Sequence, residues 1–310
     1  MRSNKKGRKS RRTRRKYTRR KRGGGSMNNT SKKILFCKLH GGLGNQIFIY
    51  AAALAIKGLL GMPLILIEVD DNPHSQTNYI PFFKGGEAAN LSDVQSRFDN
   101  AVKMPEQIGQ NSPEFMSKLS EYKKTDCKIE STYYHYFKLL EPIIPKIKSD
   151  FISELAKRYP DFKANISNGS SEDKMFFMHV RRGDHETVGW SSPVEYFSSA
   201  LAALGDIPDV IHVISNDIPF CKKQIEEGKW KSSKLRVFED PDELKTMYLM
   251  SLCKGGAILT KSTFSWWGAI FGPHENPNST IVYPKEAPNH PINKFTFPER
   301  TGKKWMTVPE

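Results

Sequence analysis

Short apolar runs alternate with longer amphipathic segments over the second half of the chain. The runs predict strands, and the segments between them, with apolar residues at helical spacing, predict helices. We expect strands at 175–180, 210–214, 235–238, 257–260 and 280–283, and helices at 193–204, 219–227, 241–253 and 263–271. Strands that alternate with helices pair in parallel, so this pattern predicts a doubly wound sheet of the α/β class.

The first half shows the same alternation near its start. Residues 34–39 predict a buried strand, and a glycine loop leads from there into an expected helix at 45–60 and a second strand at 64–69. This order of elements is one βαβ unit, which implies parallel pairing in the first half as well.

One apolar stretch, residues 47–67, approaches the length of a membrane-spanning helix. It contains Lys57, and Gly61-Met62-Pro63 divide it into a helix-length piece and a strand-length piece. Because a membrane span needs about 20 continuous apolar residues, we interpret the stretch as helix, turn and strand of a soluble protein.

Between the two alternating regions the pattern is weaker. Pro, Asn and Ser punctuate residues 72–130, which we interpret as short helical pieces, and residues 146–159 predict a longer helix. Residues 160–173, PDFKANISNGSSED, are polar and turn-rich, which is typical of a domain boundary. We therefore expect an N-terminal α/β domain over 27–165 and a C-terminal Rossmann-like domain over 166–310, facing each other across a cleft.

The charge of the chain is concentrated at its N-terminus. The 310 residues carry a formal net charge of +15, but residues 1–22 hold 14 of the 48 Lys and Arg and no acidic residue. Like charges repel each other and bury no apolar surface, so residues 1–26, which end in Gly23-Gly24-Gly25-Ser26, predict a disordered basic tail and a flexible linker. The rest of the chain has 34 basic and 33 acidic residues, which argues against a nucleic-acid-binding surface on the fold itself.

The tail has several interpretations. It suits a solvated arm, a nuclear address, a contact to nucleic acid or a tether to an anionic membrane. No apolar stretch follows its basic residues, so no secretory signal peptide is predicted. We expect a cytoplasmic or peripheral membrane-associated protein without a transmembrane helix, with nuclear targeting by the tail as the alternative.

Cysteine and acidic residues give no metal signature. Cys37, Cys127, Cys221 and Cys253 lie far apart, with no CxxC pair and no histidine at metal-finger spacing. This spacing argues against a disulfide scaffold and a structural zinc site, so we expect free buried thiols. There is also no DxD run and no cluster with octahedral-metal spacing, so no metal site is predicted.

The first candidate site is HGGLGNQ at 40–46, which joins the first expected strand to its helix. Glycines at this position let backbone N–H groups approach a ligand, and the N-terminus of the helix favours an anion. A dinucleotide fingerprint is a rival interpretation, but GxGxxG read from Gly42 places the bulky Ile47 where a small residue belongs. A tight turn without a ligand is the other alternative.

The second candidate site is HVRRGD at 179–184, at the end of the strand 175–180. Two adjacent arginines at the end of a strand are costly to hold together without an anion. Asp184 neutralises only one of them, which leaves the other for a phosphate whose oxygens match the guanidinium fork. The alternative is a cluster of arginines that pair with carboxylates of their own loop.

The third candidate site opens the helix at 263–271. Its hydroxyls and N–H groups predict a second anion site, whereas the alternative assigns Ser262 a capping role and places Trp266 and Trp267 in the core. Asp217, after the strand 210–214, could accept two donors from a guanine edge or cap the next helix. Two anion sites and an arginine pair at the ends of strands together predict a nucleoside diphosphate, with arginine supplying the charge that Mg²⁺ supplies elsewhere.

At this point the chain resembles a known family. The blocks GGLGNQIFIYAAALA, HVRRGD, SNDIPFCK and LMSLCKGGAILTKSTFSWWGAIFG, in this order, resemble the bacterial and eukaryotic α-1,2-fucosyltransferases of glycosyltransferase family 11, and the closing GKKWMTV is similar to the end of that family. The resemblance covers about residues 33–310. It implies a GT-B-like fold, GDP-L-fucose as the donor substrate, inversion at the anomeric carbon, no cofactor and no required metal.

The resemblance also implies roles for single residues, because the HxRRxD block is shared with core α-1,6- and protein O-fucosyltransferases. Arg181 matches the arginine that holds the β-phosphate and stabilises the leaving GDP, and Asp184 is either a candidate base or the residue that orients Arg182. Lys261 stands where the family usually has Asn, so its side chain either adds charge at the phosphates or turns to solvent. The matched substrate contacts are His179 and Asp217 for guanosine, Ser262, Thr263 and Phe264 for the pyrophosphate, and Asn45 for the donor; Gly42, Gly44 and Arg182 join them as candidate substrate-binding residues.

The expected reaction is the transfer of L-fucose to a galactose 2-hydroxyl of a glycan acceptor. The alternatives are another fucosyl linkage, another nucleotide-sugar donor, or a basic-tailed nucleic-acid-binding protein with an inactive transferase body.

Overall fold

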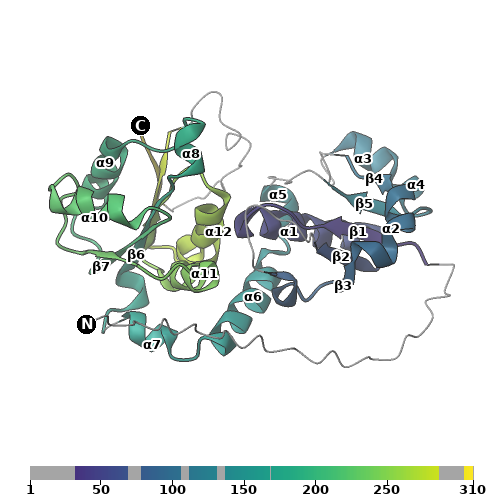
Figure 1. Cartoon of the computed structure of the whole chain (residues 1–310), viewed down its shortest axis with the longest axis horizontal. Coiled ribbons are helices and arrows are strands. Elements are labelled where there is room, and N and C mark those ends of the chain that lie inside the picture. The colour runs from purple at the N-terminus through teal and green to yellow at the C-terminus, as the bar shows by residue number, and fades with distance from the viewer. Residues whose placement is uncertain are drawn as a thin grey trace, which may run out of the picture. The chain divides into compact units, whose positions relative to one another are not determined.

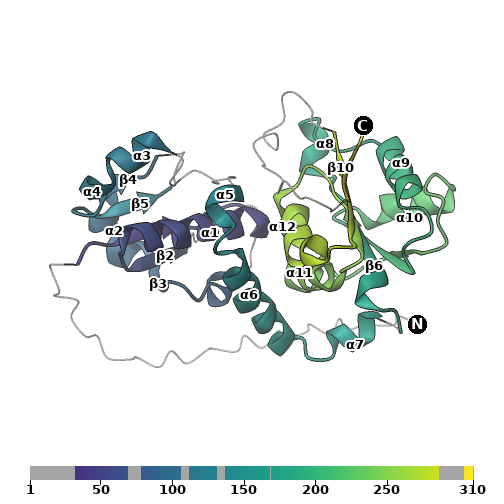
Figure 2. The ribbon, with the colours of Figure 1, turned by 180° about the vertical axis from the view of Figure 1, so that it is seen from behind.

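The strands of the chain form two separate parallel sheets, which Figures 1 and 2 show from opposite sides. The computed structural model describes residues 32–68, 78–105, 112–130, 137–167, 169–285 and 304–309. From Lys33 onward the chain forms one compact unit. The basic tail and glycine linker predicted for residues 1–26 lie outside the described residues.

The first sheet has the strand order β3-β2-β1-β5-β4, and all neighbouring strands are parallel. Its strands are β1 (Leu35–Lys38), β2 (Leu64–Glu68), β3 (Glu87–Asn90), β4 (Val102–Lys103) and β5 (Cys127–Ile129). The helices of this part are α1 (Leu43–Leu60), α2 (Leu91–Asn100), α3 (Pro113–Ser117), α4 (Leu119–Tyr122) and α5 (Phe137–Leu140), with the 3-10 turn η1 (Ile80–Phe82). The predicted βαβ unit β1-α1-β2 is confirmed.

Side chains alternate between the faces of this sheet, as the pleat of a strand requires. Leu35 and Cys37 of β1 lie in the large core that contains α1, whereas Phe36 lies in a smaller core with Phe98 of α2. Helix α1 is long and apolar enough to cross a membrane, but 67% of that window is buried inside the fold. It ends at Gly61, whose φ of 69° suits glycine. The interpretation as helix, turn and strand is therefore confirmed.

Three strands lie in the region that the sequence suggested to be short helical pieces, so that prediction was incomplete. Strand β3 is exposed and has the sequence EAAN, and β4 has two residues. Such strands carry no apolar run. They are stabilised by hydrogen bonds to neighbouring strands of the sheet and not by burial of their own side chains.

The second sheet has the order β11-β10-β9-β6-β7-β8, again with parallel neighbours throughout. Counted from β6 as the first strand, this is the 3-2-1-4-5-6 order of the Rossmann fold. The strands are β6 (Met175–Val180), β7 (Val210–Ser215), β8 (Leu235–Val237), β9 (Gly256–Ile258), β10 (Thr280–Pro284) and β11 (Lys304–Val308). The first five were predicted. Strand β11 was not, because its sequence KWMTV mixes polar and apolar residues.

Helices cover both faces of this sheet (Figure 1). Phe176 and Met178 of β6 pack with α9 (Val194–Leu204) and α10 (Ile218–Glu226), whereas Phe177 packs in the core that contains α11 (Glu243–Leu252) and α12 (Thr263–Phe271). The remaining elements are α6 (Ile144–Arg158), α7 (Phe162–Ser167), α8 (Asp184–Thr187), η2 (Glu172–Lys174) and η3 (Pro273–Glu275). The helix predicted at 146–159 is α6.

Phe162 in the polar segment 160–173, and Tyr159 just before it, contact residues of the second sheet's side. Phe162 stacks on Tyr248 of α11 with ring centroids 5.5 Å apart, and the Tyr159 hydroxyl donates to Asp242 Oδ2 at 2.7 Å.

The four cysteines are free and buried, as predicted, and burial raises the pKa of each thiol. These thiols are therefore unreactive near neutral pH.

A buried histidine makes the stability of this fold depend on pH. His212 lies in β7, and burial, followed by the charge of Arg236, lowers its pKa to about 4. Between about pH 6.5 and pH 4 the unfolded chain binds a proton at His212 that the folded chain does not. The contribution of the neutral His212 to the unfolding free energy is therefore lost as the pH falls, by up to about 1.4 kcal/mol per pH unit.

We predict that His212→Leu flattens the decline of the unfolding free energy between about pH 7 and pH 5 in urea denaturation. His179, with a pKa lowered to about 3, contributes equally to both proteins. Parallel declines in the two proteins would contradict the prediction.

Candidate functional site

The candidate site lies where β6 and β9 end side by side in the second sheet. Strand β6 pairs with β7 on one side and with β9 on the other, so the order of the strands reverses at this point. Doubly wound sheets bind their ligands at such a switch point, beyond the carboxyl ends of the strands. The predicted residues follow these strands: Arg181 and Arg182 come after β6, Asp217 after β7, and Ser262 after β9.

The first turns of α1 and α12 pack against each other at this place. A Cβ atom on Gly44 would lie 2.5 Å from the backbone nitrogen of Phe264 and 2.6 Å from the carbonyl carbon of Thr263. One turn further on, the Phe48 ring lies 4.8 Å from Trp266 and 4.9 Å from Trp267, measured between ring centroids. The structure thus brings the glycine loop of the first sheet and the turn after β9 into one site.

Two positive helix ends therefore lie together. An N-terminus carries about half an elementary charge, and neither α1 nor α12 has an acidic residue in its first turn. The N-cap of α1 is Gly42, which has no side chain to accept a hydrogen bond. Gln46 fixes the loop before it, because its Nε2 donates to the Gly41 carbonyl at 2.8 Å. Neighbouring positive ends repel each other and are stabilised by a bound anion, so this geometry favours an anion site over a plain turn.

The residues after β9 combine capping and core roles. Ser262 caps α12, because its Oγ accepts from the Phe264 backbone nitrogen at 3.3 Å. Trp266 and Trp267 are buried in the core, which confirms the alternative for these two side chains. Lys261 has an exposed fraction of 7%, so the suggestion that it turns to solvent was wrong. Asn45 is half-buried in the first turn of α1.

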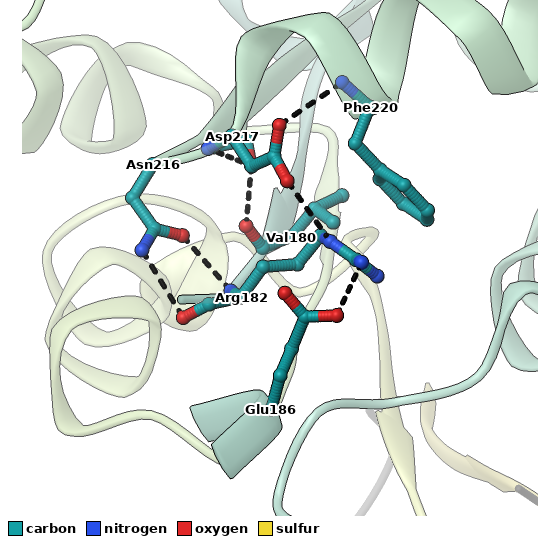
Figure 3. A network of polar contacts seen from close by, with 7 residues as sticks. Val180, Arg182, Glu186, Asn216, Asp217 and Phe220 are labelled. Atoms are coloured by element: carbon teal, nitrogen blue, oxygen red, sulfur yellow. Dashed lines mark hydrogen bonds and ion pairs between the residues drawn. The ribbon is translucent and has the colours of Figure 1, made fainter. Parts of the chain in front are cut away.

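Both arginines after β6 have carboxylate partners. Arg181 Nη2 donates to Asp184 Oδ1 at 2.7 Å. Arg182 Nε donates to Asp217 Oδ2 at 3.2 Å, and its Nη2 donates to Glu186 (Figure 3). The suggestion that Asp184 orients Arg182 was therefore wrong. The alternative of arginines that pair with carboxylates of their own loop holds for both residues, and Arg182 also pairs with Asp217 after β7. Glu186 was not among the predicted site residues, although its spacing of four residues from Arg182 indicates the pair.

The two arginines differ in how firmly they are held. Arg182 lies with its guanidinium carbon 3.5 Å from the centroid of the Phe220 ring, and its backbone nitrogen and carbonyl bond Asn216 at 2.9 and 3.1 Å (Figure 3). Arg181 pairs with Asp184 alone among the described residues, and their side chains are 33% and 57% exposed. Because such exposed pairs contribute about 0.2–1 kcal/mol, a phosphate can displace Asp184 from Arg181, while Arg182 holds the loop in place.

The two residues matched to guanosine contacts, Asp217 and His179, both form hydrogen bonds within the protein. Asp217 Oδ1 accepts from the Phe220 nitrogen at 3.0 Å and so caps α10. The His179 ring is buried, with Nδ1 2.9 Å from Thr260 Oγ1 and its centroid 5.8 Å from that of Phe264. Burial, followed by the charge of Arg181, lowers the pKa of His179 to about 3, so the ring is neutral. It joins the ends of β6 and β9 and is not suited to carry a proton in catalysis.

The contact at Gly44 gives a direct test of the site. We predict that Gly44→Ala lowers the unfolding free energy by about 1–3 kcal/mol, because the new methyl group overlaps the backbone of α12, and that it weakens binding of GDP. The matched control is Gly58→Ala in the same helix, where a Cβ meets no atom within 4 Å. The control should be as stable as the wild type or up to about 1 kcal/mol more stable. Equal stability of the two variants in thermal unfolding would show that the helices do not meet at Gly44.

Comparison with known proteins places this site in a family. The model of glycosyl transferase family 11 matches residues 24–307. The O-antigen biosynthesis glycosyltransferase WbnK of Escherichia coli is 29% identical over 121 residues, which are 35% of this chain and 37% of that protein. The chain thus matches little more than a third of the length of this curated relative.

Solved structures give the fold. The structure of the α-1,6-fucosyltransferase NodZ soaked with GDP-fucose has a TM-score of 0.50 and 13% identity, over 78% of this chain and 93% of that one. Selenomethionine NodZ from Bradyrhizobium has the same score and coverage with 12% identity. This likeness, with the two parallel sheets, confirms the predicted GT-B-like α/β fold. The family match spans most of the chain, and the protein belongs to glycosyltransferase family 11.

Proposed function

We propose that this protein transfers L-fucose from GDP-L-fucose to a galactose 2-hydroxyl of a glycan, with inversion at the anomeric carbon. The observation that carries the proposal is the meeting of the α1 and α12 N-termini at Gly44, beside Arg181 at the switch point of the second sheet. A diphosphate is the anion whose charge and size suit two adjacent helix ends and one available guanidinium. The NodZ structure soaked with GDP-fucose supports a nucleoside diphosphate sugar as the donor.

The reaction needs negative charge to be stabilised on the departing GDP. In this proposal the backbone N–H groups at the starts of α1 and α12 hold the diphosphate, and Arg181 releases Asp184 to bind the β-phosphate. As the bond from the anomeric carbon to the phosphate oxygen breaks, the charge that develops on that oxygen faces fixed positive groups. Arg182 binds no substrate in this scheme and instead fixes the backbone that carries Arg181, through Asn216, Asp217 and Glu186.

The proposed chemistry uses no metal. Among the described residues, no group of three or more His, Cys, Asp or Glu could hold a metal ion, and the sequence has no DxD run. In this proposal arginine and the helix ends supply the charge neutralisation.

A screen of donors and acceptors tests the proposal. GDP-L-fucose, GDP-mannose and UDP-galactose are each offered with galactose-terminated oligosaccharides, and the linkage of the product is determined by NMR. We expect transfer from GDP-L-fucose alone, an α-1,2 bond to galactose, and undiminished activity in EDTA. Transfer from another donor or another linkage would overturn the finer assignment, and a complete loss in EDTA that Mg²⁺ or Mn²⁺ restores would overturn the role given to Arg181.

Arg181 should be indispensable for turnover. We predict that Arg181→Ala lowers kcat about 10²–10³-fold, because one preorganised donor at a developing anion is lost. Arg181→Lys should also be slow, since an ammonium group cannot replace the bidentate guanidinium. The matched control is Arg97→Ala, which removes an arginine that pairs with Asp126 at 2.8 Å on the first sheet's side. More than half the wild-type rate in Arg181→Ala would exclude Arg181 as the residue that stabilises GDP.

A further inference from the structure

The turn that follows the arginine pair is built to hold its side chains in fixed positions. It begins at Gly183, whose φ is 68°, and includes the short helix α8. The Glu186 nitrogen donates to the Gly183 carbonyl at 3.0 Å, and the Trp190 nitrogen donates to the His185 carbonyl at 2.7 Å. Arg182 anchors Glu186 from the adjoining strand end. Backbone hydrogen bonds and one ion pair therefore hold this turn, which adjoins Arg181.

His185 is the unused titratable group of this turn. Its ring lies edge-on to Trp190, with centroids 5.7 Å apart and an angle of 87° between the planes. Its Nδ1 is sealed from solvent and has no hydrogen-bond partner among the described residues. A buried polar atom without a partner costs about 1–3 kcal/mol, and such an atom in a native protein calls for an explanation, of which a catalytic role of the side chain is one.

The other acidic and imidazole groups of 179–190 already have partners. Asp184 holds Arg181, and Glu186 holds Arg182. His179 is bonded to Thr260 and fully buried. A carboxylate that pairs with arginine is a weakened base, so His185 is the group of this segment best suited to accept a proton.

Burial, more than the neighbouring charges, favours the neutral form of His185. Burial first, and then the positive charge of Arg181, lower the pKa of His185, and the carboxylate of Asp184 opposes them only partly. The imidazole is consequently neutral at pH 7 and remains a base below pH 6.5.

The same turn presents an apolar surface. Val188 and Trp190 are 54% and 37% exposed, which is unusual for large apolar side chains. An aromatic ring held in place beside a reaction centre suits the apolar face of a hexose, with the hydroxyl groups of the sugar left free for polar contacts.

We propose that His185 takes the proton of the acceptor hydroxyl, while Val188 and Trp190 seat the ring of the acceptor sugar. The inference rests on the proposed function. The acceptor oxygen forms its bond to the anomeric carbon of fucose, and the bond from that carbon to the β-phosphate oxygen breaks. Its electron pair leaves with GDP at Arg181, and the proton of the hydroxyl passes to the imidazole of His185 and then to water. Asp184, the earlier candidate base, is a partner of Arg181 in this scheme.

The experiment compares His185→Gln with the same-turn control Thr187→Ala. We expect His185→Gln to lower kcat for transfer about 10²-fold, to change the dissociation constant of GDP less than about twofold, and to abolish the acid limb of the kcat/KM profile. In the wild type this limb should fall below pH 6.5 and follow a single ionisation. The control should keep wild-type kcat, GDP binding and pH profile.

Two further variants separate the parts of the proposal. Trp190→Ala should raise the KM for the acceptor at least about tenfold with unchanged GDP binding, and Trp190→Phe should restore most of the loss because it keeps an aromatic ring. If His185→Gln keeps more than half of kcat or retains the acid limb, or if it loses GDP binding, the proton-acceptor role is overturned.

The outcomes also distinguish this inference from the proposed function. Failure of the wild type to bind GDP or to transfer fucose overturns the proposed function itself. A wild type that transfers fucose without any acid limb overturns only the role of His185, even if the variant does not fold.

Discussion

The structure depends on the close approach of two helices at a residue without a side chain. Gly44 meets the backbone of Thr263 and Phe264 at a distance that no Cβ atom tolerates. Because of this approach, Phe48 reaches Trp266 and Trp267, and the apolar face of the first sheet shares one core with α11 and α12. The same contact joins the glycine loop to the switch point of the second sheet, so core packing and the candidate site have a common origin.

This packing brings positive groups close together at the candidate site, which is electrostatically unfavourable. Two helix N-termini with no acidic residue in their first turns lie together, and the half-buried Arg181 follows the neighbouring strand. Asp184 neutralises part of the positive charge of Arg181. The first turns of α1 and α12 contain no acidic residue that would do the same for the helix ends. An anion that binds all three groups stabilises the packed arrangement, so ligand binding and the joining of the two sheets are linked in free energy.

Much of the fold could be predicted because buried parallel strands are nearly continuous apolar runs, as MFFMHV in β6 shows. The short exposed strands β3 and β4 could not, because partners in the sheet hold them and not their own residues. At the site, the sequence placed Arg181, Asp217 and Ser262 after the correct strands. The sequence did not predict which carboxylate pairs with which arginine. The direction of each carboxylate depends on the four residues of α8 and on the loop after β7.

The adjacent arginines illustrate why the pairs matter for function. Their residue type and position do not separate them, and only the family resemblance assigned the phosphate to Arg181. In the structure Arg182 is only 20% exposed, and contacts with Asp217, Glu186 and Phe220 fix its guanidinium, so taking it away would leave two carboxylates without their partner. Arg181 has one exposed partner and can exchange it at little cost. One arginine therefore holds the loop, and the other is available to a ligand. His185 lies four residues after Arg181 in the sequence, in the short helix α8, and the charge of Arg181 acts on its ring.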